Sequence, residues 1–172
     1  LWIGTFGTGL YHYNTSTGYL KQYLFSANNM NTISNNQIRS IIVAQDGNLW
    51  IGTNDGLNNF NPKTGSFKRF NYQVAAVNSI SSDEIFTLHQ DQKGMIWIGT
   101  SGGGLNKYDP VKNTFESFRV KEGLAGNDVY GIQEDKRGTL WISTDNGITN
   151  IDPILHTFRN YYREDELQGN QF

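Results

Sequence analysis

The pentapeptide Leu-Trp-Ile-Gly-Thr opens this chain and returns unchanged at residues 49–53. It comes back with one substitution each as IWIGT at residues 96–100 and as LWIST at residues 140–144. All four tryptophans of the chain lie in these copies, spaced 48, 47 and 44 residues apart. Such a period with similar content in each copy is the signature of a repeat architecture. Any fold for this chain must therefore accommodate four equivalent units.

Each copy of the repeat is expected to form four short strands. The second copy reads IRSIIV, LWIGT, GLNNF and SFKRFNY, all rich in β-branched and aromatic residues. The turn after the first strand holds a glycine in each of the three complete copies, Gly47, Gly94 or Gly138, which supplies the positive φ that closes a hairpin. Asn-Pro or Asp-Pro steps start the turn before the fourth strand in three copies, since proline cannot continue a ladder.

Four antiparallel strands in about 45 residues make the blade of a β-propeller. We therefore predict an all-β fold, a β-propeller of four-stranded antiparallel blades. Residues 1–172 are expected to form a partial propeller of about four blades, a fragment of a larger ring of the seven-bladed type. The expected units are an incomplete blade at 1–25, which lacks its first strand, blades at 37–72, 84–120 and 128–163, and the lead-in to a further blade at 164–172.

Composition excludes several classes of function. The net charge of −2 provides no basic face for nucleic acid. The absence of cysteine removes disulfides, thiolate catalysis and cysteine-based zinc sites. The three histidines lie at non-equivalent positions of different copies, so no metal site is expected. No apolar run reaches the 18 or so residues of a membrane span. We therefore expect no cofactor, and contact with a membrane only through a larger parent protein.

The repeat resembles that of a known family. The stretches NLWIGTNDGLNNFNPKTGSF and MIWIGTSGGGLNKYDPVKNTF, the second preceded by NSISSDEIFTLHQD, resemble the two-component regulator propeller repeat. The resemblance covers essentially the whole chain, with mild departures at Ser143, Ile151 and Thr15. It implies a ligand-sensing, periplasmic segment of a bacterial two-component sensor histidine kinase, without enzyme activity of its own. It further implies an oligosaccharide as ligand, with the remaining blades and domains of a homodimeric receptor as partners.

Candidate ligand-binding residues are expected where the copies differ at one end of the propeller. The start of the first strand and the loop after LWIGT should emerge on the same face, because successive strands are antiparallel. Aromatic rings there would stack on sugar faces, while polar side chains would bind hydroxyl groups. A plain packing or turn-capping role is the competing interpretation of each residue. The candidates are Arg39, Phe86 and Tyr130 on the first strands and Phe6, Asn54, Asp55, Ser101, Asp145 and Asn146 in the loops.

Two alternatives remain open at this stage. A propeller glycoside hydrolase or lyase would need paired carboxylates across the channel, for which the first strands offer only Glu84 and Asp128. A protein–protein interaction scaffold would instead expose an apolar patch. Asp91 and Asp135 resemble the Asp-box turns of sialidase-type propellers but are interpreted as structural. Of the histidines, His89 on a first strand is the one that could contact a ligand.

The invariant tryptophans are assigned to the structural core. Binding residues should vary from copy to copy, whereas packing residues meet the same neighbour in every blade. Each tryptophan is therefore expected to be buried between blades, with isoleucine on the opposite face of the strand. These residues are Trp2, Trp50, Trp97 and Trp141.

Overall fold

The computed structural model describes residues 1–76 and 78–169. The described residues form fifteen β-strands and two short 3-10 helices, so the all-β prediction is confirmed. The strands are β1 (Trp2–Gly4), β2 (Leu10–Tyr13), β3 (Leu20–Tyr23), β4 (Ile38–Val43), β5 (Leu49–Thr53), β6 (Gly56–Asn61), β7 (Ser66–Phe70), β8 (Ile85–Gln90), β9 (Ile96–Thr100), β10 (Gly104–Asp109), β11 (Thr114–Phe118), β12 (Val129–Glu134), β13 (Leu140–Thr144), β14 (Gly147–Asp152) and β15 (Thr157–Tyr161). The 3-10 helices are η1 (Val120–Glu122) and η2 (Arg163–Asp165).

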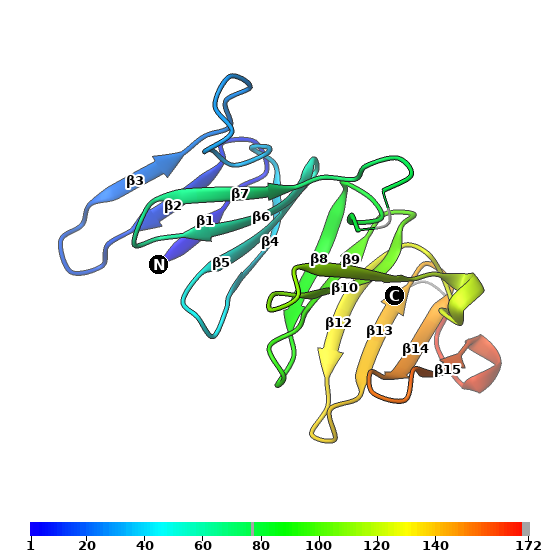
Figure 1. Ribbon diagram of the computed structural model, residues 1–172. Coiled ribbons are helices and arrows are strands. Elements are labelled where there is room, and N and C mark those ends of the chain that lie inside the picture. Colours follow the sequence, from blue (N-terminus) through cyan, green and yellow to red (C-terminus); the bar gives the residue numbers. More distant parts are fainter. Residues whose placement is uncertain (77, 170–172) are drawn as a thin grey trace.

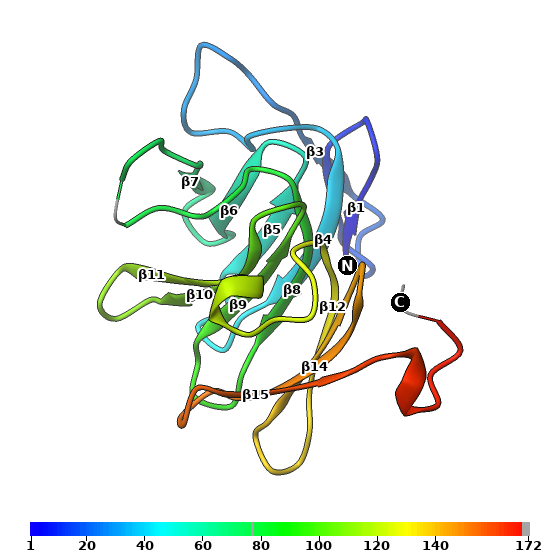
Figure 2. The same cartoon turned by 90° about the vertical axis from the view of Figure 1, so that its right-hand side faces the viewer.

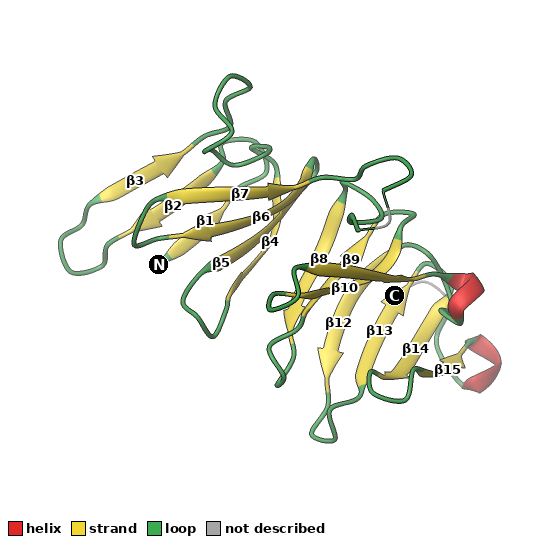
Figure 3. Ribbon diagram, viewed as in Figure 1, coloured by secondary structure: helices red, strands yellow, loops and turns green. Residues whose placement is uncertain are grey.

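The strands form four antiparallel sheets, each made of strands consecutive in sequence (Figures 1 and 3). The first sheet has three strands, β1 to β3, and the next three sheets have four strands each. The strands of the four sheets span residues 2–23, 38–70, 85–118 and 129–161. The expected lead-in at 164–172 contains no strand over 164–169, and its last three residues lie outside the described part of the chain.

The four sheets are arranged along an arc with their first strands on the inside. Strand β4 lies against β8, and β8 lies against β12, whereas β7 and β11 project away from them (Figure 2). In the first sheet the innermost strand is β1, because this sheet begins with LWIGT. The first strands thus form a common wall, and their ends define two rims.

The tryptophan of each blade packs against the next blade along the chain. Trp50 shares a core cluster with Ile96 and Ile98, the two isoleucines that flank the tryptophan of the following blade. Trp97 packs in the same way with Leu140 and Ile142. Alternate residues of LWIGT-type strands therefore face opposite neighbours, which explains why the run is apolar without alternation.

Trp141 departs from the expectation that every tryptophan is buried. Its side chain is 38% exposed, compared with 4% for Trp50 and 0% for Trp97, and Trp2 is half-buried. The reason is that no described blade covers the outer face of the last sheet. The indole stacks instead on Tyr161, with ring centroids 5.5 Å apart, beside an open depression of about 500 Å³. Among the described residues Trp141 is therefore only partly covered, by Tyr161 of its own blade.

The glycine of LWIGT is required by the close approach of neighbouring blades. A Cβ added to Gly52 would lie 2.5 Å from Ile85 Cγ2, and one added to Gly99 would lie 2.6 Å from Val129 Cγ1. Both neighbours are the first residue of the next blade's inner strand. The fourth copy has Ser143 at this position, on the face that no described blade covers.

Arg69 anchors the long loop between the first two sheets. From β7 its guanidinium donates hydrogen bonds to main-chain oxygens of the loop, namely Thr32 at 2.7 Å, Asn29 at 3.0 Å and Ile33 at 3.1 Å. Desolvation by burial lowers the pKa of Arg69, opposed by the negative charge of Asp55. The loop is thereby fixed next to the rim on which the candidate ligand-binding residues lie.

Candidate functional site: an aromatic row on one rim

Three of the candidate residues sit on β-bulges at equivalent positions. The pairing of each first strand with its second shifts by one residue, between Ile38 and Ser40, between Ile85 and Thr87, and between Val129 and Gly131. A bulge leaves its extra residue outside the ladder and re-aims that side chain. The extra residues are Arg39, Phe86 and Tyr130.

These three side chains and Phe6 form one continuous stack, which we call the rim row. The Arg39 guanidinium lies between two rings, with Cζ 5.3 Å from the centroid of Phe6 and 5.0 Å from that of Phe86. The Phe86 and Tyr130 rings stack with centroids 5.3 Å apart and planes 24° apart. The row therefore runs across all four blades and ends in two exposed rings, Phe6 at 64% and Tyr130 at 45%.

The rim row and the loops after LWIGT emerge at the same end of the sheets. The backbone N–H of Asn54 donates to Gln37 O at 3.1 Å, and that of Asp145 donates to Asp128 O at 3.1 Å. Ser101 repeats this contact in the third blade, donating its backbone N–H to Glu84 O at 3.0 Å. Each loop is thus joined to the residue that precedes its own first strand.

Two polar side chains hold Arg39 in the row. Its Nη2 donates a 2.9 Å hydrogen bond to Glu84 Oε1 of the next blade, and its Nε donates to Asn54 Oδ1. Asn54 is oriented in turn by a 2.6 Å hydrogen bond from its Nδ2 to Gln37 Oε1. Arg39 therefore enters the row with its charge already paired and its orientation fixed.

Two carboxylates lie near Tyr130 at the other end of the row. Desolvation of the phenol, together with the negative charges of Asp128 and Asp145, raises the pKa of Tyr130 above its ordinary value. Its hydroxyl group therefore remains protonated at neutral pH and can donate a hydrogen bond. Asp128 Oδ1 also accepts the N–H of Gly102 at 2.6 Å, and Asp145 Oδ1 accepts that of Asp128 at 3.1 Å.

Three other candidates serve the turns. The N–H of Asp55 is bonded to Thr53 Oγ1, and its main-chain oxygen accepts from Asn71. Asn146 has the equivalent contact in the fourth blade, where Nδ2 also reaches Ala125 O at 3.3 Å. Ser101 contributes the backbone contact described above. The structure thus brings Phe6, Arg39, Asn54, Phe86, Tyr130 and Asp145 together and leaves Asp55, Ser101 and Asn146 beside them.

Sequence reasoning missed the role of Glu84 as the partner of Arg39. It considered Glu84 and Asp128 only as carboxylates for an enzyme. The sequence does hold a signal for this role, namely position. Glu84 directly precedes the first strand of its blade, as do Gln37 and Asp128, and so lies at the same end of the sheet as the bulge residues. The side-chain pairing itself depends on how adjacent blades are spaced.

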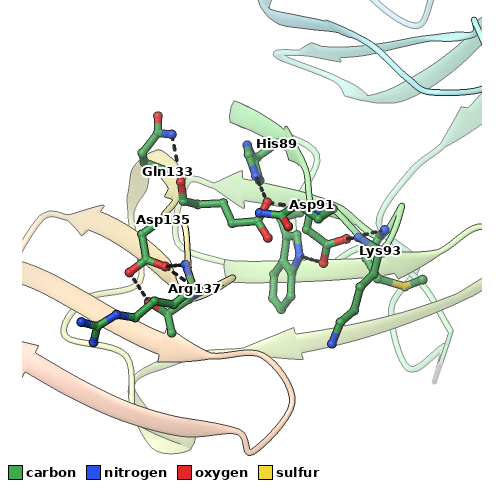
Figure 4. Close-up of polar contacts among 11 residues, drawn as sticks. His89, Asp91, Lys93, Gln133, Asp135 and Arg137 are labelled. Atoms are coloured by element: carbon green, nitrogen blue, oxygen red, sulfur yellow. Dashed lines mark hydrogen bonds and ion pairs between the residues drawn. The ribbon is translucent and has the colours of Figure 1, made fainter.

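The opposite end of the inner strands holds a different set of polar contacts (Figure 4). Asp91 accepts the indole N–H of Trp97 at 2.8 Å and the backbone N–H groups of Lys93 and Met95, both at 2.9 Å. His89 Nε2 lies 3.5 Å from Glu134 Oε2 of the next blade. The contacts of Asp91 close the hairpin turn, and those of His89 join two blades. Within residues 1–76 and 78–169 no cluster of three or more histidine, aspartate or glutamate residues could hold a metal ion.

The family model of the two-component regulator propeller matches three segments, residues 32–55, 79–102 and 123–146. Each segment spans a bulge residue and its LWIGT-type strand. Three of the four blades thus contain a segment that matches the two-component regulator propeller repeat. Every part of the rim row except Phe6 lies within a matched segment.

A solved structure and a protein relative carry the comparison further. The chain superposes with a TM-score of 0.79 and 25% identity on the extracellular domain of BT3049 from B. thetaiotaomicron, described as a putative hybrid two component system. The match covers 94% of this chain and 22% of that chain. "Histidine kinase P4" of Formosa agariphila is 32% identical over 56 residues, which is 33% of this chain and 4% of the kinase. This chain therefore spans a small part of either protein.

The propeller fold is shared more widely. Virginiamycin B lyase from Staphylococcus aureus matches with a TM-score of 0.66 at 12% identity, over 90% of this chain and 48% of the lyase. At this identity the likeness concerns the fold alone. No helix among the described residues has the length and hydropathy needed to span a bilayer.

Proposed function

We propose that this chain is part of the periplasmic, ligand-sensing propeller of a two-component sensor histidine kinase, and that the rim row binds an oligosaccharide. The observation that carries the proposal is the stack of Phe6, Arg39, Phe86 and Tyr130, one residue from each of four blades, on a single rim. Repeats that are uniform in their core place three kinds of side chain there, namely two phenylalanines, an arginine and a tyrosine. The likeness to the extracellular domain of BT3049 supports the sensor role.

The geometry of the row determines where a sugar would stack. The inner ring faces are covered by the stack itself, so a pyranose would meet the exposed terminal rings of Phe6 and Tyr130. Asn54 and the Tyr130 hydroxyl group would bind sugar hydroxyls beside those rings. An apolar platform with a few oriented polar groups is the usual composition of a small-ligand site.

Signalling would follow from differential affinity. A ligand changes an equilibrium between two receptor states only by the difference in its affinity for them. In this proposal the rim row, with the remaining blades and domains of the homodimeric receptor, binds sugar more tightly in one arrangement of the paired ectodomains. The kinase equilibrium across the membrane would then shift toward that arrangement.

The test is titration calorimetry of the chain against a broad panel of oligosaccharides, followed by Phe6→Ala and Tyr130→Ala. We expect binding that either variant weakens by about tenfold or more, the effect of losing about 1.4 kcal/mol. Tyr19→Ala is the matched control, because Tyr19 is 64% exposed at the turn before β3. Absence of binding to every glycan would overturn the proposal in favour of a protein–protein scaffold.

The hydrolase alternative is less well supported by the contacts of its carboxylates. Glu84 is bonded to Arg39, and Asp128 holds the loop at Gly102. Neither side chain is thus left without a structural partner. Release of new reducing ends from any polysaccharide in the panel would favour the enzyme over the sensor.

A further inference from the structure

We infer that the rim row selects neutral or amino sugars and rejects uronic acids and sulfated sugars, with Glu84, Asp128 and Asp145 as the residues that determine this specificity. The inference rests on the proposed function, since it names the class of oligosaccharide that the row would take. It concerns only the charged side chains in contact with the row or beside it.

Arg39 is the cation of the row. Arg39 is the residue that would ordinarily bind a carboxylate or sulfate of an acidic sugar. Its Nη2 is bonded to Glu84 Oε1 at 2.9 Å and its Nε to Asn54, and its Cζ lies 5.3 Å from the ring centroid of Phe6 and 5.0 Å from that of Phe86. An anionic ligand would have to displace Glu84 from Arg39. The displaced Glu84 carboxylate would then lie close to the negative charge of the ligand.

Tyr130 is at the other end of the row. Asp145 Oδ1 accepts the backbone N–H of Asp128 at 3.1 Å, so the Asp145 carboxylate lies beside the residue that is two positions before Tyr130. Desolvation, and then the negative charges of Asp128 and Asp145, raise the pKa of the Tyr130 phenol. A negative group placed on the exposed side of Tyr130 would meet the same repulsion. The carboxylates of Glu84, Asp128 and Asp145 thus lie at the row, whose one arginine is already paired.

Carboxylates favour the other two sugar classes for a simple reason. They only accept hydrogen bonds, and sugar hydroxyls can donate them. An ammonium group adds an attraction of opposite charges, which strengthens at low salt. Discrimination between ligands often depends on such a repulsive element as well as on attractive contacts.

The experiment compares β-1,4-linked tetramers of N-acetylglucosamine, glucosamine and glucuronic acid within the oligosaccharide panel, using the whole 172-residue chain. We expect every binder in the panel to be neutral or amino-substituted, and acidic members to bind at least about tenfold more weakly than their neutral counterparts. Tighter binding of uronate or sulfated members would overturn the inference and leave the sensor proposal intact. Absence of binding in all classes would overturn both.

A triple variant tests the residues themselves. Glu84→Gln, Asp128→Asn and Asp145→Asn remove three charges, but each new amide oxygen can still accept the hydrogen bond that the carboxylate held. We expect the ratio of neutral to acidic affinity to fall by about tenfold or more in this variant. The control variant, Asp46→Asn with Glu116→Gln and Glu164→Gln, removes the same charge away from the row. An equal change in both variants would assign the selectivity to net charge alone and overturn the role of these three residues.

Discussion

The indole Nε1 of Trp97 donates a 2.8 Å hydrogen bond to Oδ2 of Asp91, and both side chains are buried, at 0% and 4% exposure. The bond ties the hairpin turn of the third blade to the contact surface between the third and fourth blades. Trp50 occupies the equivalent place in the second blade, where Ala44 replaces the aspartate. The tryptophan therefore packs in the same place with or without this hydrogen bond, which adds to the packing of Trp97.

Trp97→Ala is expected to lower the free energy of unfolding by about 3–5 kcal/mol, the usual cost of emptying a buried aromatic site. The lost contacts are those with Leu140 and Ile142 of the next blade. Urea denaturation would measure the change. Trp141→Ala is the matched control and should cost distinctly less, because Trp141 is 38% exposed. Equal losses in the two variants would contradict the packing of Trp97 between two blades.

Gly99→Ala should destabilise the chain by about 1–3 kcal/mol, the typical cost of overpacking a core. The added Cβ would meet Val129 Cγ1 and Val129 O, each at 2.6 Å. Thermal unfolding followed by circular dichroism would detect the loss. Ser143→Ala alters the equivalent position of the last blade and should stay within about 0.5 kcal/mol. An unchanged melting temperature in Gly99→Ala would mean that the two adjacent blades can move apart without loss of stability.

Arg69→Met should loosen the loop over residues 25–33. The substitution removes the guanidinium donors from the main-chain oxygens of Asn29, Thr32 and Ile33, at a cost of about 2 kcal/mol. We expect faster amide hydrogen exchange confined to that loop. Lys68→Met, one residue earlier and exposed, is the control and should leave exchange unchanged. Unaltered exchange in Arg69→Met would show that the loop is fixed by other contacts.

Stability is expected to fall in acid because of three turn aspartates. The pKa of Asp109 is lowered chiefly by the N–H of Lys112, that of Asp135 by the Thr139 hydroxyl group, and that of Asp152 by the N–H of Leu155. The folded state therefore binds fewer protons than the unfolded state. Their contribution is complete above the ordinary value of 3.8 and is lost as the pH falls through the lower folded-state values.

Melting temperatures between about pH 5 and pH 2 would measure this loss. In the triple variant Asp109→Asn, Asp135→Asn and Asp152→Asn, the melting temperature should fall less as the pH is lowered. Each amide oxygen still accepts the turn hydrogen bond but does not titrate. An unchanged fall of the melting temperature in the triple variant would assign the loss of stability to other carboxylates.

The repeat pattern was enough to predict the blades and the packing of Trp50 and Trp97. Every copy has the same internal neighbours, so alignment of the copies reveals which positions face the next blade. The exposure of Trp141 could not be obtained in this way, because its burial depends on contact with a further blade, and the described residues form none beyond the fourth sheet. The pairing of Arg39 with Glu84 was also missed, since it depends on the spacing of two blades and on a shift of register that periodicity does not reveal.

The bulges on the three inner strands separate the residues that form the sheet from the residues that are exposed on the rim. Arg39, Phe86 and Tyr130 each lie outside the ladder, so a change of residue there leaves the paired backbone of that blade undisturbed. The residue at this position can therefore differ between copies while their interiors stay alike. Under the proposed function, related arrays would bind different ligands by changing one such residue per blade.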